Sequence, residues 1–121
     1  MKKILVVDDA KVVRMVISKV LTKNGFAIAG EAENGREALE KYKQLKPDAV
    51  TMDITMPEVD GIQGLKDIIA YDKNAKVIMI SAIDQRDSLA EAIRNGASGY
   101  IVKPFEDDSM TIAINKLFNQ E

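Results

Sequence analysis

The chain has 121 residues, of which 46% are hydrophobic and 30% are charged, and it carries a net charge of −2 with a pI near 5.2. These values are typical of one globular domain, which we expect to span residues 1–121. The slightly acidic balance disfavours nucleic-acid binding through phosphates, and no apolar run is long enough to cross a membrane or to form a secretory signal. We therefore expect a cytoplasmic protein that binds neither nucleic acid nor a membrane.

Two residue types are missing from the sequence, cysteine and histidine. Without cysteine there are no disulfides, no thiolate nucleophile and no zinc–thiolate site. Without histidine the chain lacks the usual general base and every Ser-His-Asp or Cys-His arrangement. Any chemistry must therefore depend on carboxylates, lysine, hydroxyl groups or a metal ion.

Apolar runs that are typical of buried strands alternate along the chain with apolar residues at helical spacing. The predicted strands lie at residues 3–7, 26–32, 48–52, 76–80 and 99–102. The predicted helices follow them, at residues 13–21 with a stop signal at Asn24-Gly25, at 36–46, at 62–69, from a cap at Asp84 to Asn95-Gly96, and at 110–117. The second helix should turn Leu39, Tyr42 and Leu45 inward, and Pro47 should end it.

Five strand–helix units in succession predict an α/β fold. It is a doubly wound (βα)5 sandwich, in which helices cover both faces of a five-stranded parallel sheet. We adopt the strand order 2-1-3-4-5, the common flavodoxin-like arrangement, in which the first and third strands are neighbours. Ligands of such sheets bind at the carboxyl ends of the strands, near the point where the strand order reverses. The residues at those ends are therefore the candidates for a functional site.

Carboxylates stand where the first and third predicted strands end. Asp8 and Asp9 follow the first strand, Asp53 follows the third, Ser81 the fourth and Lys103 the fifth. In the adopted strand order the three carboxylates meet in one pocket, with the hydroxyl and the lysine beside them. Clustered carboxylates repel one another, and Mg²⁺ offsets that repulsion because it prefers oxygen ligands and also contacts phosphate.

The chemistry of this set points to phosphoryl transfer onto a carboxylate, assisted by Mg²⁺. An aspartate can act as a nucleophile toward phosphorus, and a lysine and a hydroxyl suit phosphoryl oxygens. Taken singly, each residue has a plainer reading: Asp8 and Asp9 as a helix cap, Asp53 as a turn residue, Ser81 as a strand-end hydroxyl and Lys103 as a solvated lysine. Their joint placement at one edge of the sheet favours the functional reading.

Four stretches carry a resemblance to a known family. They are ILVVDD at residues 4–9, DAVTMDITMPEVDG at 48–61, VIMISA at 77–82 and GYIVKPF at 99–105. With these motifs in this order, the sequence resembles the response-regulator receiver domains of the CheY-like family over essentially its whole length. It is most similar to the stand-alone chemotaxis-type regulators. The strand order adopted above is the order of that family and is not an independent prediction.

The resemblance implies a phosphoacceptor and a metal site. Asp53 matches the aspartate that is phosphorylated in family members. Asp9 matches the carboxylate that binds Mg²⁺ directly, and Asp8 matches the one that acts through water. The backbone carbonyl of Thr55 then completes the metal site together with Asp53. Mn²⁺ is expected to substitute for Mg²⁺.

The resemblance also implies a switch. Ser81 matches the hydroxyl that moves to meet the phosphoryl group, and Lys103 matches the lysine that pairs with that group. Tyr100 matches the aromatic residue that turns inward on activation, although taken alone it reads as a core residue. The peptide bond between Lys103 and Pro104 is cis in relatives.

On this resemblance the chain is a signalling switch and not a turnover enzyme. We expect a histidine kinase as phosphoryl donor, a phosphatase as a further partner, and a target protein that binds the face of the fourth helix, fifth strand and fifth helix. Chemotaxis-type regulators imply the flagellar motor switch as that target. Ile112 is a candidate contact on this face, whereas Leu89 and Ile93 are read equally well as contacts or as core. We expect a monomer.

Two other readings of the function stay open. The chain fits a stand-alone phosphorelay intermediate, or a receiver that binds partners without phosphorylation, although the full set of site residues disfavours the latter. Two enzyme and cofactor classes fit less well. Phosphatases that form an aspartyl phosphate need a second acid at the position of Thr55. Flavodoxin-like flavin binders need a Ser/Thr/Gly phosphate loop where this chain has Asp8 and Asp9.

Overall fold

The computed structural model describes residues 1–56, 58–82, 84–103 and 107–118. Within these residues five strands form one parallel sheet in the predicted order, β2-β1-β3-β4-β5. The strands are β1 (Lys3–Val7), β2 (Ala27–Ala32), β3 (Ala49–Asp53), β4 (Val77–Ser81) and β5 (Gly99–Val102). The helices are α1 (Lys11–Lys23), α2 (Gly35–Leu45), α3 (Gly61–Tyr71), α4 (Arg86–Arg94) and α5 (Asp107–Phe118). None of the described helices is long and apolar enough to span a bilayer.

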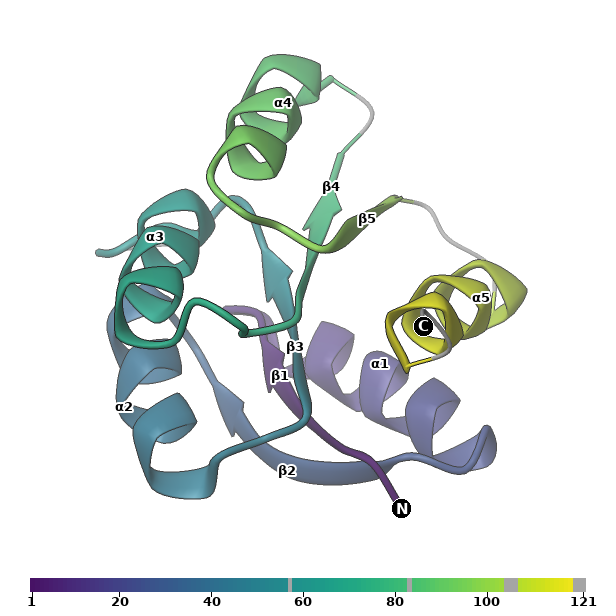
Figure 1. The fold of residues 1–121 in the computed structure, drawn as a ribbon. Coiled ribbons are helices and arrows are strands. Elements are labelled where there is room, and N and C mark those ends of the chain that lie inside the picture. Colours follow the sequence, from purple (N-terminus) through teal and green to yellow (C-terminus); the bar gives the residue numbers. More distant parts are fainter. Residues whose placement is uncertain (57, 83, 104–106, 119–121) are drawn as a thin grey trace.

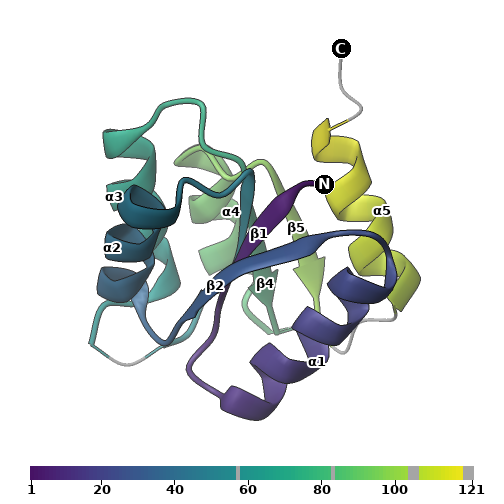
Figure 2. The ribbon, with the colours of Figure 1, turned by 90° about the horizontal axis from the view of Figure 1, so that it is seen from below.

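Helices cover both faces of the sheet (Figure 1, Figure 2). One face carries α1 and α5, and the other carries α2, α3 and α4. The two faces have separate cores because successive residues of a strand point to opposite sides. In β1, Ile4 and Val6 belong to the core under α1 and α5, whereas Leu5 and Val7 belong to the other core. All four side chains are fully buried, which explains why this strand reads as a continuous apolar run.

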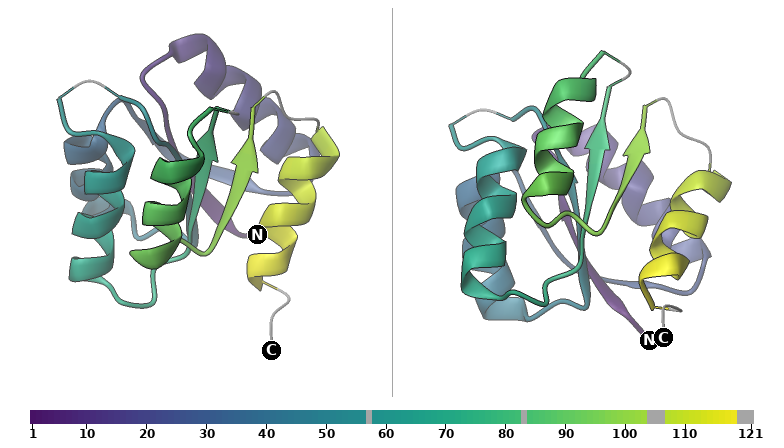
Figure 3. Two further views of the ribbon diagram at one scale, coloured as in Figure 1. Left: turned by 90° about the horizontal axis from the view of Figure 1, so that it is seen from above. Right: turned by 45° about the horizontal axis from the view of Figure 1, so that its top comes forward.

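The carboxyl ends of the parallel strands share one edge of the sheet, where β4 and β5 are seen to end side by side (Figure 3). The fourth strand lies one residue later than predicted, so Ser81 is the last residue of β4 and not the first residue of the following loop. Asp53 is likewise the last residue of β3. Both side chains are therefore fixed by strand pairing, and this edge is the framework of the site.

The start of α4 corrects the prediction that Asp84 caps this helix. The helix begins at Arg86 with Gln85 at its N-cap position, and no side chain caps it. Asp84 lies inside a turn that the Gln85 amide closes by donating to the carbonyl of Ala82 at 3.1 Å. The aspartate therefore comes one residue too early to cap the helix.

The C-terminal turn of α2 also departs from the prediction. Leu39 and Tyr42 contribute to the core as expected, but Leu45 is 38% exposed. Leu45 is the last residue of α2 and lies against Gly30 of β2, which is an edge strand. Because β2 is the edge of the sheet, no further strand covers the leucine. The prediction failed here because helical periodicity shows which face of a helix is apolar but not where the sheet ends.

Candidate functional site

Three carboxylates meet at the carboxyl ends of β1 and β3. These strands are neighbours, with Val7 paired to Met52, so the residues that follow them are brought together. One carboxylate oxygen from each of Asp8, Asp9 and Asp53 lies within 4.8 Å of the others. Asp8 and Asp53 are buried, at 1% and 6% exposure, whereas Asp9 is exposed. The cluster is therefore open to solvent on the side of Asp9.

Lys103 supplies a positive charge to this cluster. Its Nζ lies 3.6 Å from Oδ1 of Asp53 and 3.8 Å from Oδ2 of Asp8. The residue follows β5, and its amide donates to the carbonyl of Ser81 at 2.7 Å, which continues the pairing of β5 with β4. The lysine is thus held at the strand edge while its side chain reaches across to the two buried carboxylates.

Burial and mutual repulsion weaken the acidity of the two buried aspartates. Burial is the main reason that the pKa of Asp53 is raised to about 6, and the charge of Asp8 raises it further, while Lys103 opposes the change. Burial likewise raises the pKa of Asp8, against the hydrogen bond from the Ala10 amide and the charge of Lys103. At neutral pH the ionised cluster is therefore destabilised, and an added cation relieves this.

The donor set fits a hard divalent cation. Oδ1 of Asp8 accepts a hydrogen bond from the Ala10 amide at 2.9 Å, whereas its Oδ2 is buried and has no hydrogen-bond partner among the described residues. A buried carboxylate oxygen without a donor is costly, and a bound cation satisfies it. The ligands available here are all oxygens, which is what Mg²⁺ prefers. The residues present therefore fit Mg²⁺ or Mn²⁺.

The two predicted switch residues, Ser81 and Tyr100, differ in their burial and in their position relative to the acidic cluster. Ser81 is buried, and within the described part of the chain its Oγ has no hydrogen-bond partner. Tyr100 lies at the surface with 51% of the residue exposed, and it lines a cleft with Ile112 instead of entering the core. The sheet brings Ser81 and Lys103 to the edge that carries Asp53 but keeps Tyr100 apart. Pro104, and with it the predicted cis bond, lies outside the described residues.

Thr55 lies two residues after Asp53, on an exposed part of the β3–α3 loop. Its side chain is hydrogen-bonded to Gln85, a residue that the sequence did not point to. The side-chain amide of Gln85 donates to Oγ1 of Thr55, and its Oε1 accepts from the Ala82 amide at 2.7 Å. Gln85 therefore joins the loop after β3 to the loop after β4. A glutamine outside any apolar periodicity gives no sequence signal for such a contact.

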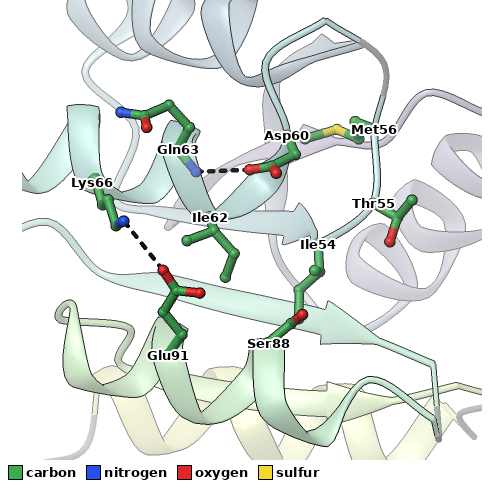
Figure 4. A pocket seen from close by; sticks show the side chains of 9 residues that line it. All are labelled: Ile54, Thr55, Met56, Asp60, Ile62, Gln63, Lys66, Ser88 and Glu91. Atoms are coloured by element: carbon green, nitrogen blue, oxygen red, sulfur yellow. Dashed lines mark hydrogen bonds and ion pairs between the residues drawn. The ribbon is translucent and has the colours of Figure 1, made fainter.

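A cleft of about 390 Å³ opens beside Thr55, between the β3–α3 segment and α4 (Figure 4). Lys66 of α3 and Glu91 of α4 form an ion pair in its wall, with 3.2 Å between Nζ and Oε2. The Asp60 side chain accepts from the Gln63 amide at 2.9 Å on the same side. The cleft separates α4 from the segment that follows Asp53.

A second residue that the sequence analysis missed is Arg14, on α1. It is buried, and its guanidinium donates to the backbone carbonyl of Asp8 at 2.7 Å. The sequence places it among apolar residues of a predicted helix, where a charged residue is normally assumed to face solvent. Its contact with the acidic loop depends on tertiary packing and has no signature in the sequence.

Comparisons with known proteins agree with this geometry. Residues 4–115 match the family model of the response regulator receiver domain. The chain is 53% identical over 116 residues to the chemotaxis protein CheY of Thermotoga maritima, which spans 96% of this chain and 97% of that protein. It is 54% identical over 117 residues to the chemotaxis protein CheY of Bacillus subtilis, over 97% of this chain and 98% of that protein.

A solved structure shares the fold over nearly the whole length. The CheX-CheY-BeF3-Mg+2 complex from Borrelia burgdorferi matches with a TM-score of 0.93 at 37% identity, over 98% of this chain and 90% of the matched chain. The similarity thus extends across the sheet edge that carries the acidic cluster and across every described helix.

Proposed function

The chain belongs to the response regulator receiver domain family, and from that premise we propose that it is a chemotaxis response regulator that is phosphorylated on Asp53. It is a signalling switch of the CheY-like type within a two-component system. In this proposal a histidine kinase donates the phosphoryl group, and the phosphorylated chain binds a target in the cytoplasm. The chemotaxis assignment is supported by identities above 50% to two chemotaxis proteins that the chain matches almost from end to end.

One observation carries the proposal. The buried carboxylate of Asp53 stands at the end of β3, where the other two carboxylates and the Lys103 ammonium converge on it. An oxygen of Asp53 forms the new O–P bond while the P–N bond to the donor's imidazole breaks, and the imidazole nitrogen leaves with the electron pair. With a pKa of about 6, Asp53 is ionised at neutral pH and ready to attack. The chain catalyses its own phosphorylation in this sense, and attack of water on the phosphorus breaks the O–P bond, releases inorganic phosphate and restores the Asp53 carboxylate.

Receiver domains of this family bind Mg²⁺ in an acidic pocket. We assign the ion here to Asp8, Asp9, Asp53 and the backbone carbonyl of Thr55, with Mn²⁺ as a substitute. When bound, it neutralises negative charge on the carboxylates and on the phosphoryl oxygens. Lys103 donates to a phosphoryl oxygen, which draws its ammonium away from the carboxylates that it contacts at 3.6 and 3.8 Å.

The response to phosphorylation is assigned to Ser81 and Tyr100. The Ser81 hydroxyl is buried without a hydrogen-bond partner in the described residues, so a phosphoryl group offers it an acceptor. Its movement pulls on the loop after β4 and leaves space for the Tyr100 ring, which is exposed, to turn inward. The face of α4, β5 and α5 then changes, where Ile93 and Ile112 are also exposed. We propose that a flagellar motor switch protein binds this face and that a phosphatase ends the signal.

Intact mass spectrometry after incubation with acetyl phosphate tests the proposal. The native chain should gain about 80 Da for one phosphoryl group in Mg²⁺ and nothing in EDTA. Asp53→Asn should gain nothing, because an amide is not a nucleophile toward phosphorus. Asp60→Asn is the matched control, since it changes an exposed acid of the same loop to another good helix cap, and it should be modified like the native chain. An adduct on Asp53→Asn would refute the assignment.

A further inference from the structure

Among the described residues Arg14 is the one positively charged side chain that is buried, with 7% of the residue exposed. It lies on α1, whose other buried residues, Ile17, Val20 and Leu21, are apolar. A guanidinium is costly to remove from water unless its donors are paired. The groups that it pairs with should therefore show why the chain keeps an arginine at this position.

The guanidinium joins the acidic loop to the end of β2. Its Nη1 donates to the backbone carbonyl of Asp8 at 2.7 Å, in a buried contact. Its Nε donates to Oε1 of Glu31 at 2.8 Å, and its Nη2 lies 3.6 Å from Oε1 of Glu33. The two glutamates are about half exposed, with 48% and 61% of their side chains accessible. The exposed carboxylates therefore fix the arginine, and the arginine fixes the carbonyl beneath the acidic cluster.

This carbonyl belongs to the peptide group that joins two of the clustered aspartates. The peptide group is planar, so holding the oxygen of Asp8 also holds the amide of Asp9 and the direction from which its side chain leaves. The loop has few other restraints. The Asp8 amide donates to the Ala32 carbonyl at 3.1 Å, and Oδ1 of Asp8 accepts from the Ala10 amide at 2.9 Å, but Ala10 at the N-cap of α1 provides no side-chain cap. Arg14 adds a separate restraint, on the carbonyl of the peptide group between the two aspartates.

We propose that Arg14 is a positioning residue of the acidic site, which holds the Asp8–Asp9 peptide group so that both carboxylates are preorganised for a divalent cation. The inference rests on the proposed function in that the cluster takes such a cation. Groups that orient metal ligands from outside the coordination sphere commonly change metal affinity by about tenfold or more. We therefore expect an effect of that order from Arg14, although it touches no side-chain oxygen of the cluster.

The sign of the effect separates positioning from simple charge. Removing a positive charge near an acidic site strengthens its attraction for a cation by Coulomb's law. Removing the restraint on the Asp8–Asp9 peptide group weakens binding, because the loop must be ordered when the ion binds. Arg14→Met removes both the charge and the hydrogen bonds, and Arg14→Lys keeps the charge but cannot reach the Asp8 carbonyl and Glu31 together. Positioning predicts weaker binding by both variants.

The test is a titration of the metal-free chain with Mn²⁺, in which the amplitude of the free-ion EPR spectrum gives the Kd. We expect the Kd to rise about tenfold in Arg14→Met and to a smaller extent in Arg14→Lys. Lys19→Met removes an exposed charge from the same helix, and Glu33→Gln alters the longest contact of the network. Both controls should stay within about twofold of the native Kd. The metal-free melting temperature of each variant is measured alongside.

Each outcome decides a separate question. A Kd that is unchanged or lowered in both Arg14 variants overturns the positioning role, even if their metal-free melting temperatures fall, because that result describes a purely structural residue. If Arg14→Met does not fold, Arg14→Lys alone decides by the same criterion. If the native chain itself fails to bind Mn²⁺, the metal site of the proposed function is refuted, and the role of Arg14 with it.

Discussion

Two regions on either side of Asp53 differ in how firmly their backbones are held. On the side of α2 and α3, side chains cap the helices: Asn34 accepts from the Glu37 amide, and Asp60 accepts from the Gln63 amide. On the side of α4 and β5, the helix begins without a side-chain cap. Asp53 thus stands on a fixed framework, and the signal from its proposed phosphorylation is expected to travel toward the less restrained side.

Close backbone contacts explain the firmness of the first region. The Gly35 amide donates to the Val59 carbonyl at 2.7 Å and so attaches the start of α2 to the β3–α3 loop. A Cβ added to Gly61 would lie 2.0 Å from the Asp53 carbonyl oxygen, and one added to Gly64 would lie 2.9 Å from Cα of Gly35. These backbones touch one another directly, so the start of α3 is closely packed against the end of β3 and against α2.

In the second region α4 packs on the core through Ala92 and Leu89, and polar side chains add contacts across a cleft. Gln85 binds Thr55 near the acceptor, and Lys66 pairs with Glu91 farther along α4 (Figure 4). Both contacts are partly exposed, so each contributes little to holding the helix. The site thus combines rigid positioning of the Asp53 carboxylate with weaker polar contacts on the side where we expect the response.

The largest expected effect comes from breaking the fixed region at Gly61. Gly61→Ala drives a Cβ into the Asp53 carbonyl and should lower the free energy of unfolding by about 3 kcal/mol. Gly99→Ala is the control, because its added Cβ would lie 3.8 Å from Ile78 in ordinary contact, and it should change stability by less than about 1 kcal/mol. Urea unfolding measures both. Equal losses would contradict a fixed framework around Asp53.

Metal binding should stabilise the folded chain by mass action. Saturating Mg²⁺ at about 100 times its Kd should add about 2.7 kcal/mol to the stability of the native chain. Asp9→Asn should remove most of that gain and slightly raise the melting temperature of the metal-free chain, because it relieves repulsion. Asp84→Asn changes an exposed acid at the same sheet edge and should keep the gain. Thermal melts with and without Mg²⁺ check this, and a metal-independent melting temperature in the native chain would contradict it.

The buried acceptor should also make stability depend on pH in metal-free buffer. Since folding raises the pKa of Asp53 from its ordinary value near 4 to about 6, the favourable contribution of this residue is complete at low pH. It is lost as the pH rises through 6, where the buried carboxylate becomes charged. Asp53→Asn should therefore melt higher than the native chain at about pH 8, and this difference should shrink toward pH 4. A difference that grows on acidification would refute the sign.

The smallest expected effect lies in the less restrained region. Lys66→Met breaks the ion pair with Glu91 and should change the free energy of unfolding by no more than about 0.5 kcal/mol, because both partners are well exposed. A double-mutant cycle with Glu91→Gln measures the coupling between the two side chains. A coupling above about 1.5 kcal/mol would mean that α4 is tied down as firmly as α2 and α3.

Much of the fold was predictable because each strand is a short run of apolar residues between turn signals. The bounds of β1 and β5 agree with the prediction, and the strand order is confirmed. The gathering of Asp8, Asp9 and Asp53 followed from that order, since adjacent strands end at one edge. Their roles, and those of the other site residues, stay predictions.

What the sequence did not reveal depends on contacts between distant elements. Gln85 binds the loop after β3, and no periodic or motif signal marks that contact. Arg14 lies on the helical face of Ile17 and Leu21, but this spacing does not show that its guanidinium binds the carbonyl of Asp8. The cap predicted at Asp84 was wrong because Gln85 closes the turn before α4, through a hydrogen bond from its amide to the Ala82 carbonyl and one from the Ala82 amide to its side chain. Leu45 was misplaced because periodicity cannot show where an edge strand leaves a helix uncovered.

Hydrogen exchange measured by mass spectrometry tests most directly whether the response at Asp53 is confined to α4 and β5. The native chain is compared with and without beryllofluoride and Mg²⁺, where beryllofluoride occupies the position of a phosphoryl group on the acceptor. We expect amide exchange to change in α4, β5 and the loop between β4 and α4, while α2 and α3 exchange as before. A change of equal size in α2 and α3, or no change in α4 and β5, would contradict it.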